Sequence, residues 1–425
     1  MIKITKLDSG IRIVTDTMKD VETVSLGFWV SVGSRFEEEN INGISHLLEH
    51  MAFKGTTSRT ALQIAEQIED VGGIINAYTS RDVTAYYVKV LKQDVPLALS
   101  ILSDIFQNST MVQEELEREK GVVIQEIGQT YDAPDEAVFE YYQSTAYPNQ
   151  SFGRSILGTA EKVKSISRET LLSYMHDEYT APRVVVSAAG NIQHDYLVGE
   201  IEKLLVSLKV KGGRKMQPVS YSGGEYRENK KIEQVNLILG FNGLPYGHKL
   251  YYAQSILATI LGGGMSSRLF QEIREKRGLV YAIYAFASSY QDSGNFGIFA
   301  GTGEKQVSEL LPVVCDELLK VDSTLKAEEI ERAKAQLRAH VLMKSESTSA
   351  RAESNARHLA IYDRVIENKE IIERINAVDE KMLVQTAQTI FSGKPTLACL
   401  GPIKHVMSYE KLTEALKSSK VNTKV

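Results

Sequence analysis

Residues 24–32 read VSLGFWVSV, an apolar stretch of strand length that carries Gly27, Phe28 and Trp29. Residues 235–242 read VNLILGFN, so the Gly-Phe pair returns at Gly240 about 210 positions later, an offset that indicates internal duplication. The segment PLALSILSDIF at residues 96–106 is echoed at nearly the same offset by SELLPVVCDEL at residues 308–318. Two matches at one offset predict a duplicated α/β unit.

Length and composition favour the same division. A chain of 425 residues exceeds the ~250–300 residues beyond which a single core usually splits. Residues 209–234 contain two glycine pairs, a proline and many charges, which is typical of a linker. We therefore predict an N-terminal domain over residues 1–210, a linker over residues 211–234 and a homologous C-terminal domain over residues 235–425.

Each domain is expected to be of the α+β class, with helices packed on a mixed, mostly antiparallel sheet. In residues 84–90 (TAYYVKV) the side-chain character alternates along the chain, which is typical of a strand. Residues 326–365 carry helix formers with apolar residues at helical spacing.

The overall composition excludes some classes of protein. A hydrophobic content of 43% and a charged content of 24% are those of an ordinary globular chain. The net charge of -5 argues against nucleic acid as the main partner and permits cationic ligands. No secretory signal and no run of ~18 apolar residues is seen, so we expect no membrane partner. Cys315 and Cys399 lack metal-type spacing and indicate reduced thiols, which fits a cytoplasmic protein.

The chemistry is concentrated at residues 43–51, which read GISHLLEHM. The apolar Leu47, Leu48 and Met51 predict a helix, and positions i, i+3 and i+4 share one helical face. His46, Glu49 and His50 have that spacing, in the order H-x-x-E-H. Two imidazoles one turn apart can bind one Zn²⁺, and the glutamate between them can take a proton from bound water.

A third ligand is expected from the helix-like residues 112–131, which contain Glu119 and Glu126. These two lie on nearly the same face but ~10 Å apart along the axis, so one is expected to bind the metal and the other to orient a ligand. The H-x-x-[DE]-H motif arises by chance, without a metal site, in roughly 2% of such chains. The alternative is therefore a solvated helix with two surface histidines. The acidic run at residues 37–39 is interpreted as a solvated loop before this helix.

His46 to His50, followed by MAFKGT at residues 51–56, resembles the active-site segment of the pitrilysin-type (inverzincin) zinc peptidases. The resemblance spans essentially the whole chain and is strongest to the β subunit of the mitochondrial processing peptidase and its bacterial relatives. It implies one Zn²⁺ per chain held by His46, His50 and Glu126, with Glu49 as the catalytic base and Glu119 as an auxiliary glutamate.

The resemblance also implies substrate-binding positions in the first domain. Phe53 matches an aromatic residue that lines the pocket past the scissile bond, although a core phenylalanine is an equal alternative. Residues 76–79 match an edge strand along which the family holds an extended substrate by main-chain hydrogen bonds. These residues are Asn76, Ala77, Tyr78 and Thr79.

An acidic pair follows Pro134, where a helix is expected to begin. Glu136 and Glu140 match residues with which the processing peptidase recognises an arginine near the cleavage point. The alternative is a solvated acidic first turn, which is common at helix N-termini.

In the second domain, residues 266–278 (SSRLFQEIREKRG) predict a helix stopped by glycine, and residues 279–286 predict a strand. Arg274 and Tyr281 match the family's Arg/Tyr pair, which can stabilise a developing oxyanion. The alternative is that Arg274 and Tyr281 have only structural roles. The glycine run at residues 262–264 resembles, at shorter length, the family's glycine-rich loop.

The expected activity is zinc-dependent endopeptidase cleavage of unfolded, basic or presequence-like peptides in an enclosed chamber. Family members form a clamp of four homologous domains, and this chain supplies half of that clamshell. Because it carries both the zinc motif and the Arg/Tyr pair, a homodimer is the simplest complete form. The alternative is a catalytically silent or partner-dependent subunit, like the family's structural core subunits, which have typically lost motif residues.

Overall fold

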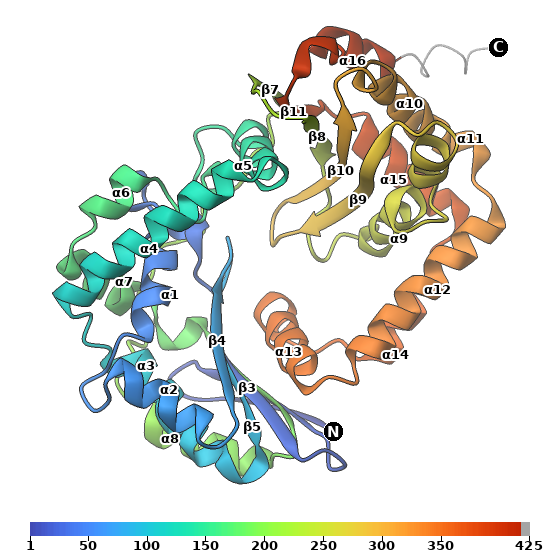
Figure 1. The fold of residues 1–425 in the computed structure, drawn as a ribbon. Coiled ribbons are helices and arrows are strands. Elements are labelled where there is room, and N and C mark those ends of the chain that lie inside the picture. The colour runs from blue at the N-terminus through green and yellow to red at the C-terminus, as the bar shows by residue number, and fades with distance from the viewer. Residues whose placement is uncertain (418–425) are drawn as a thin grey trace. The chain divides into compact units, whose positions relative to one another are not determined.

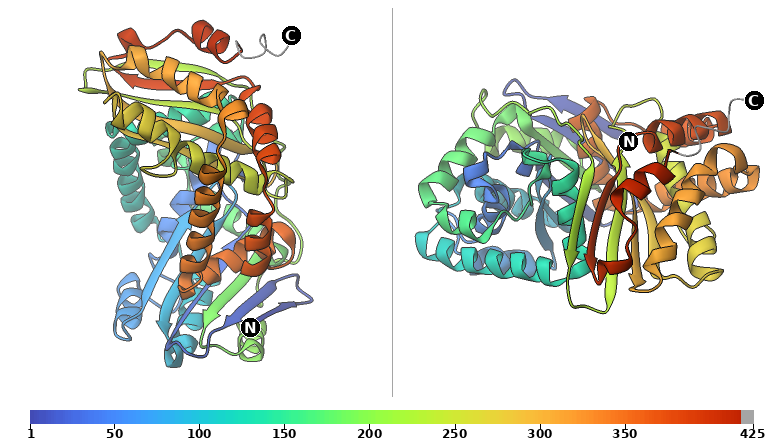
Figure 2. Two further views of the ribbon diagram at one scale, coloured as in Figure 1. Left: turned by 90° about the vertical axis from the view of Figure 1, so that its right-hand side faces the viewer. Right: turned by 90° about the horizontal axis from the view of Figure 1, so that it is seen from above.

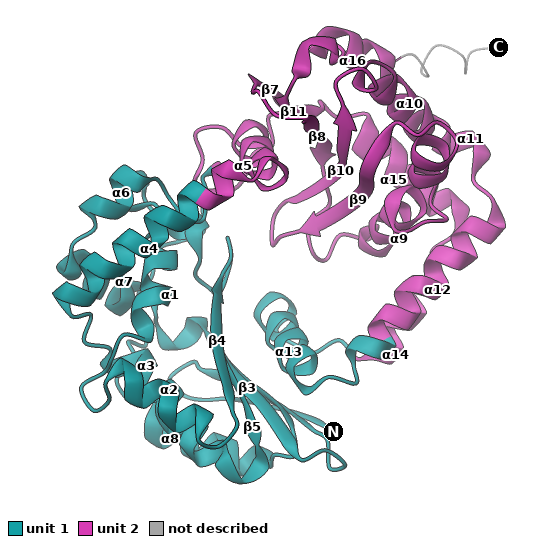
Figure 3. Ribbon diagram, viewed as in Figure 1, with its two compact units in different colours: residues 1–128, 154–217, 342–366 teal, residues 129–153, 218–341, 367–425 magenta. Residues whose placement is uncertain are grey.

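The protein is described from a computed structural model, which places residues 1–417 and forms two compact units. Figure 3 shows the first unit, residues 1–128, 154–217 and 342–366, in teal. The second unit, residues 129–153, 218–341 and 367–417, is drawn in magenta. Each unit is built on one sheet with helices packed against it (Figures 1 and 2).

The first sheet has six strands in the order β1-β2-β6-β3-β5-β4. Its strands are β1 Ile2–Lys6, β2 Arg12–Thr17, β3 Thr23–Val30, β4 Ile74–Thr79, β5 Thr84–Leu91 and β6 Val184–Gly190. The central β6 reads VVVSAAG and is buried throughout, which suits a strand covered on both faces. β2 and β6 are parallel, and the other neighbours are antiparallel. β4 lies at the edge of this sheet.

The second sheet has five strands in the order β7-β11-β8-β10-β9. Its strands are β7 Gly224–Asn229, β8 Gln234–Asn242, β9 Val280–Ser289, β10 Gly294–Gly303 and β11 Thr396–Gly401. Its order and directions repeat those of β2-β6-β3-β5-β4, including one parallel pair, β7 with β11. The repeated Gly-Phe motif lies in β3 and β8, each the strand between two buried neighbours. The topology therefore fits the predicted duplication.

The helices of the first unit cover both faces of its sheet. They are α1 Ile44–Ala52, α2 Ala61–Glu69, α3 Val95–Asn108, α4 Gln113–Asp132, α6 Ala160–Ser165, α7 Arg168–Glu178, α8 His194–Leu204 and α13 Thr348–Tyr362. α1 packs against β4 and α3 against β5, whereas α13 packs against β2, β3 and β6. On the α13 side the core joins Ala352, Ala356 and Leu359 to Trp29 and Val185.

The helices of the second unit cover its sheet in the same way. They are α5 Pro134–Ala146, α9 Tyr251–Gly262, α10 Val307–Leu319, α11 Val321–Thr324, α12 Ala327–Lys344, α14 Asn368–Asn376, α15 Glu380–Phe391 and α16 Tyr409–Ala415. α5 packs against β7, β8 and β11 through buried Tyr142. A Cβ at Gly240 would lie 2.3 Å from the Tyr142 ring, so only glycine allows this close approach.

The compact units differ from simple sequential halves, because each half of the chain contributes one helix that packs against the sheet of the other unit. α5, from the first half, packs in the second unit, and α13, from the second half, packs in the first. This division by contacts does not decide where the duplicated domains begin, so the boundaries at residues 210 and 235 stay a prediction. Residues 418–425 of the predicted second domain lie outside the described residues.

The segment predicted as a linker, residues 211–234, contains strand β7, so that prediction was wrong for Gly224–Asn229. β7 reads GEYREN and lies at the edge of its sheet. Edge strands commonly carry charged residues, so the composition of β7 resembles that of a linker. Among residues 1–417, no helix has both the length and the apolar character that crossing a membrane requires.

Candidate active site

The helix that carries the H-x-x-E-H motif is held firmly at its start. Gly43 precedes α1 with a φ of 98°, a left-handed conformation that favours glycine. The buried Glu37 carboxylate accepts hydrogen bonds from the Gly43 N–H (2.8 Å) and the Ser45 N–H (2.9 Å). A carboxylate at this end satisfies free N–H groups and suits the helix dipole. The predicted solvated loop was therefore wrong for Glu37, which is only 3% exposed.

Three side chains of the first unit converge, those of His46 and His50 on α1 and of Glu126 on α4. The Nε2 atoms of His46 and His50 each lie 3.6 Å from the same Oε2 atom of Glu126. Zinc with bonds of ~2.0–2.1 Å in a tetrahedral site requires donor atoms roughly 3.4 Å apart. The observed spacing fits that requirement, and these donors all lie within 4.8 Å of one another. The two imidazoles and the carboxylate thus form a possible metal site.

The protonation state of His46 suits a metal ligand. Burial, together with the neighbouring His50 ring, lowers the pKa of His46 to about 4, so the ring is neutral near pH 7. Its Nδ1 atom is buried and has no hydrogen-bond partner among the described residues. The Nε2 atom lies 3.6 Å from Glu126 Oε2, and in the tautomer that carries the proton on Nδ1 it can bind a cation.

The second nitrogen of His50 is oriented by Glu119. His50 Nδ1 lies 3.0 Å from Glu119 Oε2, a hydrogen bond in which the ring donates to the carboxylate. The other Glu119 oxygen lies 2.7 Å from Lys54 Nζ. Glu119 and Glu126 thus reach opposite nitrogens of one ring from positions two turns apart on α4. This arrangement fixes the His50 tautomer that leaves Nε2 free for a metal.

Glu49 lies on the same face of α1 and is joined to the edge strand. Its Oε2 atom accepts a hydrogen bond of 2.6 Å from the Thr79 hydroxyl on β4. Burial raises the pKa of the Glu49 carboxyl, while the Thr79 bond acts in the opposite direction. A raised pKa strengthens a carboxylate as a proton acceptor, which suits a general base.

The predicted substrate positions of the first unit lie at the end of α1 and on β4. The half-buried Phe53 ends α1, and its ring lies 6.3 Å from that of Tyr86. β4, with Asn76, Ala77, Tyr78 and Thr79, pairs only with β5 in the first sheet. The Asn76 side chain accepts a hydrogen bond from the Ala77 N–H at 2.8 Å. The geometry permits strand addition at this edge, and the binding roles stay predictions.

The remaining predicted site residues belong to the second unit. Glu136, exposed, and Glu140, half-buried, lie on α5. Arg274 lies in a wide-turn helix, η6 (Phe270–Glu275), with its guanidinium 4.8 Å from the Phe270 ring centre. Tyr281 on β9 is 73% exposed and lines an open cavity of about 470 Å³. Their roles in catalysis or recognition stay predictions.

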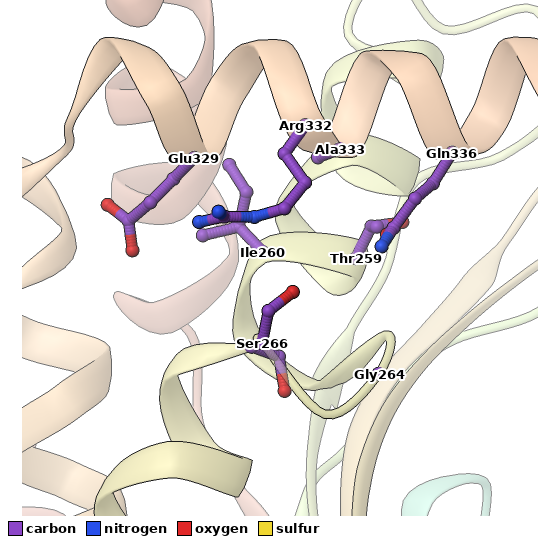
Figure 4. A pocket seen from close by; sticks show the side chains of 9 residues that line it. Thr259, Ile260, Gly264, Ser266, Glu329, Arg332, Ala333 and Gln336 are labelled. Atoms are coloured by element: carbon purple, nitrogen blue, oxygen red, sulfur yellow. The ribbon is translucent and has the colours of Figure 1, made fainter.

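Gly264, the last residue of the glycine run at residues 262–264, lines a much smaller cavity, shown in Figure 4. Gly264 and Ser266 face Arg332 and Gln336 of α12 across it. Its volume of about 10 Å³ holds one water molecule at most, so it has no room for a peptide. A substrate-guiding role of the glycine run stays a prediction.

Sequence reasoning missed two residues that position the cluster. Lys54 pairs with Glu119, and Glu37 caps α1. The signal for Glu37 was an acidic residue shortly before a helix start, a common feature of helix N-termini. Lys54 gives no comparable signal, because its partner is distant in the sequence.

Comparison with known proteins assigns the family. Residues 12–160 match the family described as Insulinase (Peptidase family M16), and residues 165–337 match the Peptidase M16 inactive domain. The chain belongs to peptidase family M16. A zinc protease of Rickettsia felis, named as uncharacterized, is 42% identical over 94% of this chain and 97% of its own length. The human mitochondrial-processing peptidase subunit beta is 34% identical over 96% of this chain and 86% of its own length.

The fold is shared with a solved structure. A protease from Helicobacter pylori superposes with a TM-score of 0.87 at 21% identity, covering 95% of this chain and 99% of that one. The predicted family and the predicted class, two homologous domains with mixed sheets and helices, are confirmed. As a member of family M16 the chain is a metallopeptidase, and relatives named zinc proteases imply zinc as its metal.

Proposed function

We propose that this M16 peptidase is a zinc-dependent endopeptidase of unfolded peptides, with one catalytic Zn²⁺ per chain. The observation that carries the proposal is the convergence of His46 Nε2, His50 Nε2 and Glu126 Oε2, with Glu49 alongside. Bound there, zinc would supply a Lewis acid that acidifies water and polarises a carbonyl.

The chain's own groups supply the remaining chemistry. Glu49, as carboxylate, accepts a proton from the attacking water and later delivers it to the leaving amine. The Thr79 hydroxyl holds the Glu49 carboxylate at 2.6 Å, so the base keeps one orientation. Glu119 holds the His50 ring through Nδ1.

An extended substrate is proposed to add to the free edge of β4, with Phe53 contacting the residue past the scissile bond. Strand addition requires main-chain groups that a folded protein has already used, so it selects unfolded segments. A basic, presequence-like substrate is favoured by the net charge of -5 and by Glu136 and Glu140. Equal cleavage of peptides with and without arginine would remove this preference.

A homodimer that encloses a chamber is proposed as the active form, with Arg274 and Tyr281 stabilising the oxyanion at the partner's zinc site. The support is that one chain carries both residue sets. The name of the human relative, a subunit beta, motivates the alternative of a partner-dependent or silent subunit. The elution volume of the chain purified alone, measured with its peptidase activity, separates these forms.

A cytoplasmic location is proposed from the two cysteines. Cys315 and Cys399 are both buried and unbridged, and burial raises the pKa of the Cys315 thiol to about 12. Such unreactive thiols suit a reducing compartment.

The test of the proposed activity is zinc analysis with hydrolysis of a denatured protein, using wild type and Glu49→Gln. The variant should keep its zinc and lose at least about a hundredfold in rate, because general base catalysis contributes that much or more. Undiminished hydrolysis by Glu49→Gln would refute the assigned base. Absence of hydrolysis by zinc-loaded wild type would favour the silent subunit.

A further inference from the structure

A cavity of about 510 Å³ in the first unit lies between the sheet and the start of α13. We propose that this cavity, the α13 pocket, is a specificity site for a large aromatic side chain of the substrate strand. The inference rests on the proposed peptidase function and adds a second recognition site on the sheet face opposite the metal cluster. Its lining residues are Ser25, Leu26, Trp29, Tyr78, Tyr87, Ser347, Ser349, Ala350, Ala352 and Glu353.

The edge strand presents its side chains alternately to two faces of the sheet. Thr79 of β4 reaches Glu49, so its side chain lies on the metal face. Its neighbour Tyr78 lines the α13 pocket, and the Trp29 Nε1–H donates to the Tyr78 hydroxyl at 3.3 Å. β4 thus connects the metal cluster on one face with the α13 pocket on the other.

A peptide that adds to β4 must follow the same alternation. If one of its side chains faces the metal cluster, both adjacent side chains face the α13 side. The pocket is therefore expected to accept side chains only from every second residue of the substrate, those adjacent to a residue that faces the metal cluster. A side chain on the metal face does not enter it.

The lining of the α13 pocket decides what it accepts. Trp29, Tyr78 and Tyr87 supply aromatic surface, and the rings of Tyr78 and Tyr87 lie 6.2 Å apart. Ala350 and Ala352 keep the helix side of the cavity open. A cavity of about 150 Å³ already binds benzene, so this space holds a phenylalanine or tyrosine side chain.

The aromatic lining of the α13 pocket and the Glu353 carboxylate disfavour acidic side chains. Glu353 is the one ionisable carboxylate among the described lining residues. The nearby Arg351 is directed to Asp16, at 2.9 Å, and Arg357 lies one helical turn beyond Glu353 and outside the lining. Arg357 interacts electrostatically with the lining residue Tyr78 and so offsets part of the Glu353 charge. A substrate aspartate would still lose its hydration beside aromatic rings, which weakens its binding.

The chain contains a probe for this pocket, because Trp29 is its single tryptophan. The experiment titrates zinc-loaded Glu49→Gln protein with synthetic peptides in which one phenylalanine moves residue by residue through a serine-alanine sequence. Parallel series carry alanine or aspartate instead. Trp29 emission reports occupancy of the pocket, and hydrolysis by wild type is measured on the same peptides.

Phenylalanine at alternate positions is expected to bind about tenfold more tightly than alanine and to change Trp29 emission, whereas aspartate binds more weakly than alanine. Ala350→Phe, which fills the pocket, should abolish both the preference and the emission change. The matched control Ser354→Phe adds the same ring to a half-buried residue of α13 outside the lining, and should keep both.

The outcomes separate the pocket from the peptidase function. Hydrolysis without any dependence on the position of phenylalanine would overturn the α13 pocket and leave the proposed function standing. An unchanged preference in Ala350→Phe would overturn it as well. If zinc-loaded wild type hydrolyses none of the peptides, the proposed function on which the pocket rests is refuted instead.

Discussion

The Glu49 carboxylate and the Thr79 hydroxyl are joined by a hydrogen bond of 2.6 Å, which links the metal-side helix α1 to the edge strand β4. The group proposed to move the proton and the strand proposed to hold the substrate therefore share one contact. A displacement of β4 would be transmitted to the orientation of Glu49.

Replacing Thr79 by valine is expected to slow hydrolysis about tenfold, because a hydrogen bond to a charged group contributes about 1.5–3 kcal/mol. The pH dependence gives the sharper readout. Burial raises the pKa of Glu49 and the Thr79 bond lowers it, so loss of the bond raises that pKa further. Since the base acts when ionised, the acidic limb of kcat/KM should move to higher pH. Thr79→Ser, which keeps a hydroxyl, should restore the wild-type profile, and an unmoved limb in Thr79→Val would contradict the assignment.

Replacing Glu119 by glutamine should weaken zinc binding by about 10–100-fold, because groups that orient a metal-bound histidine contribute that much. The physical cause is the bond of 3.0 Å from His50 Nδ1, which loses its charged acceptor. Competition with a chelator measures the affinity. Glu114→Gln, the same change at an exposed position of α4, is the control. Equal zinc affinity in both variants would show that Glu119 does not support the site.

The positions predicted best from sequence are those governed by local spacing. The helix over His46 to Met51 follows from apolar periodicity, and the separation of Glu119 from Glu126 follows from helical rise. Strands β3 and β8 were expected from their duplicated Gly-Phe motif. In each case a few neighbouring residues carry the information.

The features missed depend on contacts between residues distant in the sequence. α13 packs on the first sheet although more than 150 residues separate it from β6, and no local pattern encodes that pairing. Lys54 and Thr79 gain their roles only when α4 and β4 come beside α1. Glu37 is an exception, because its cap on α1 is local and was overlooked in a run of acidic residues.

Zinc is expected to raise the thermal stability of the protein. A ligand that binds only the folded state stabilises it by about 2.7 kcal/mol at a concentration of 100 Kd. Thermal unfolding with zinc, and after chelation, measures the effect. His46→Ala and Glu126→Ala should lose the zinc-dependent rise in Tm, whereas Glu49→Gln should keep it. A full rise in Glu126→Ala would exclude that carboxylate as a ligand.

The metal-free protein should lose stability as the pH falls from about 6.5 toward 4. The pKa of His46 is lowered to about 4 by burial and by His50, so the unfolded chain binds a proton that the folded chain rejects. Stability from this source is complete above pH 6.5 and decreases as that proton is bound. Denaturant unfolding at several pH values measures the slope. His46→Gln should have a shallower slope across this range, and parallel curves for both proteins would contradict the burial argument.

Mixing two inactive variants tests whether Arg274 and Tyr281 act on the partner's zinc site. One chain carries His46→Ala, and the other carries Arg274→Ala with Tyr281→Phe. In a dimer that acts across subunits, each mixed pair regains one intact site. Random pairing makes half of the dimers mixed, so the mixture should recover about a quarter of wild-type activity.

The control for this mixture pairs His46→Ala with Glu49→Gln. Both changes fall in the zinc-binding half, so no combination of the two chains contains an intact site, and the control should stay inactive. Different affinity tags on the two chains verify that mixed dimers have formed. If the test mixture contains tagged mixed dimers but shows no activity, the Arg/Tyr pair acts within its own chain. Full activity of the wild type eluting as a monomer would exclude the homodimer, because each chain would then complete its own site.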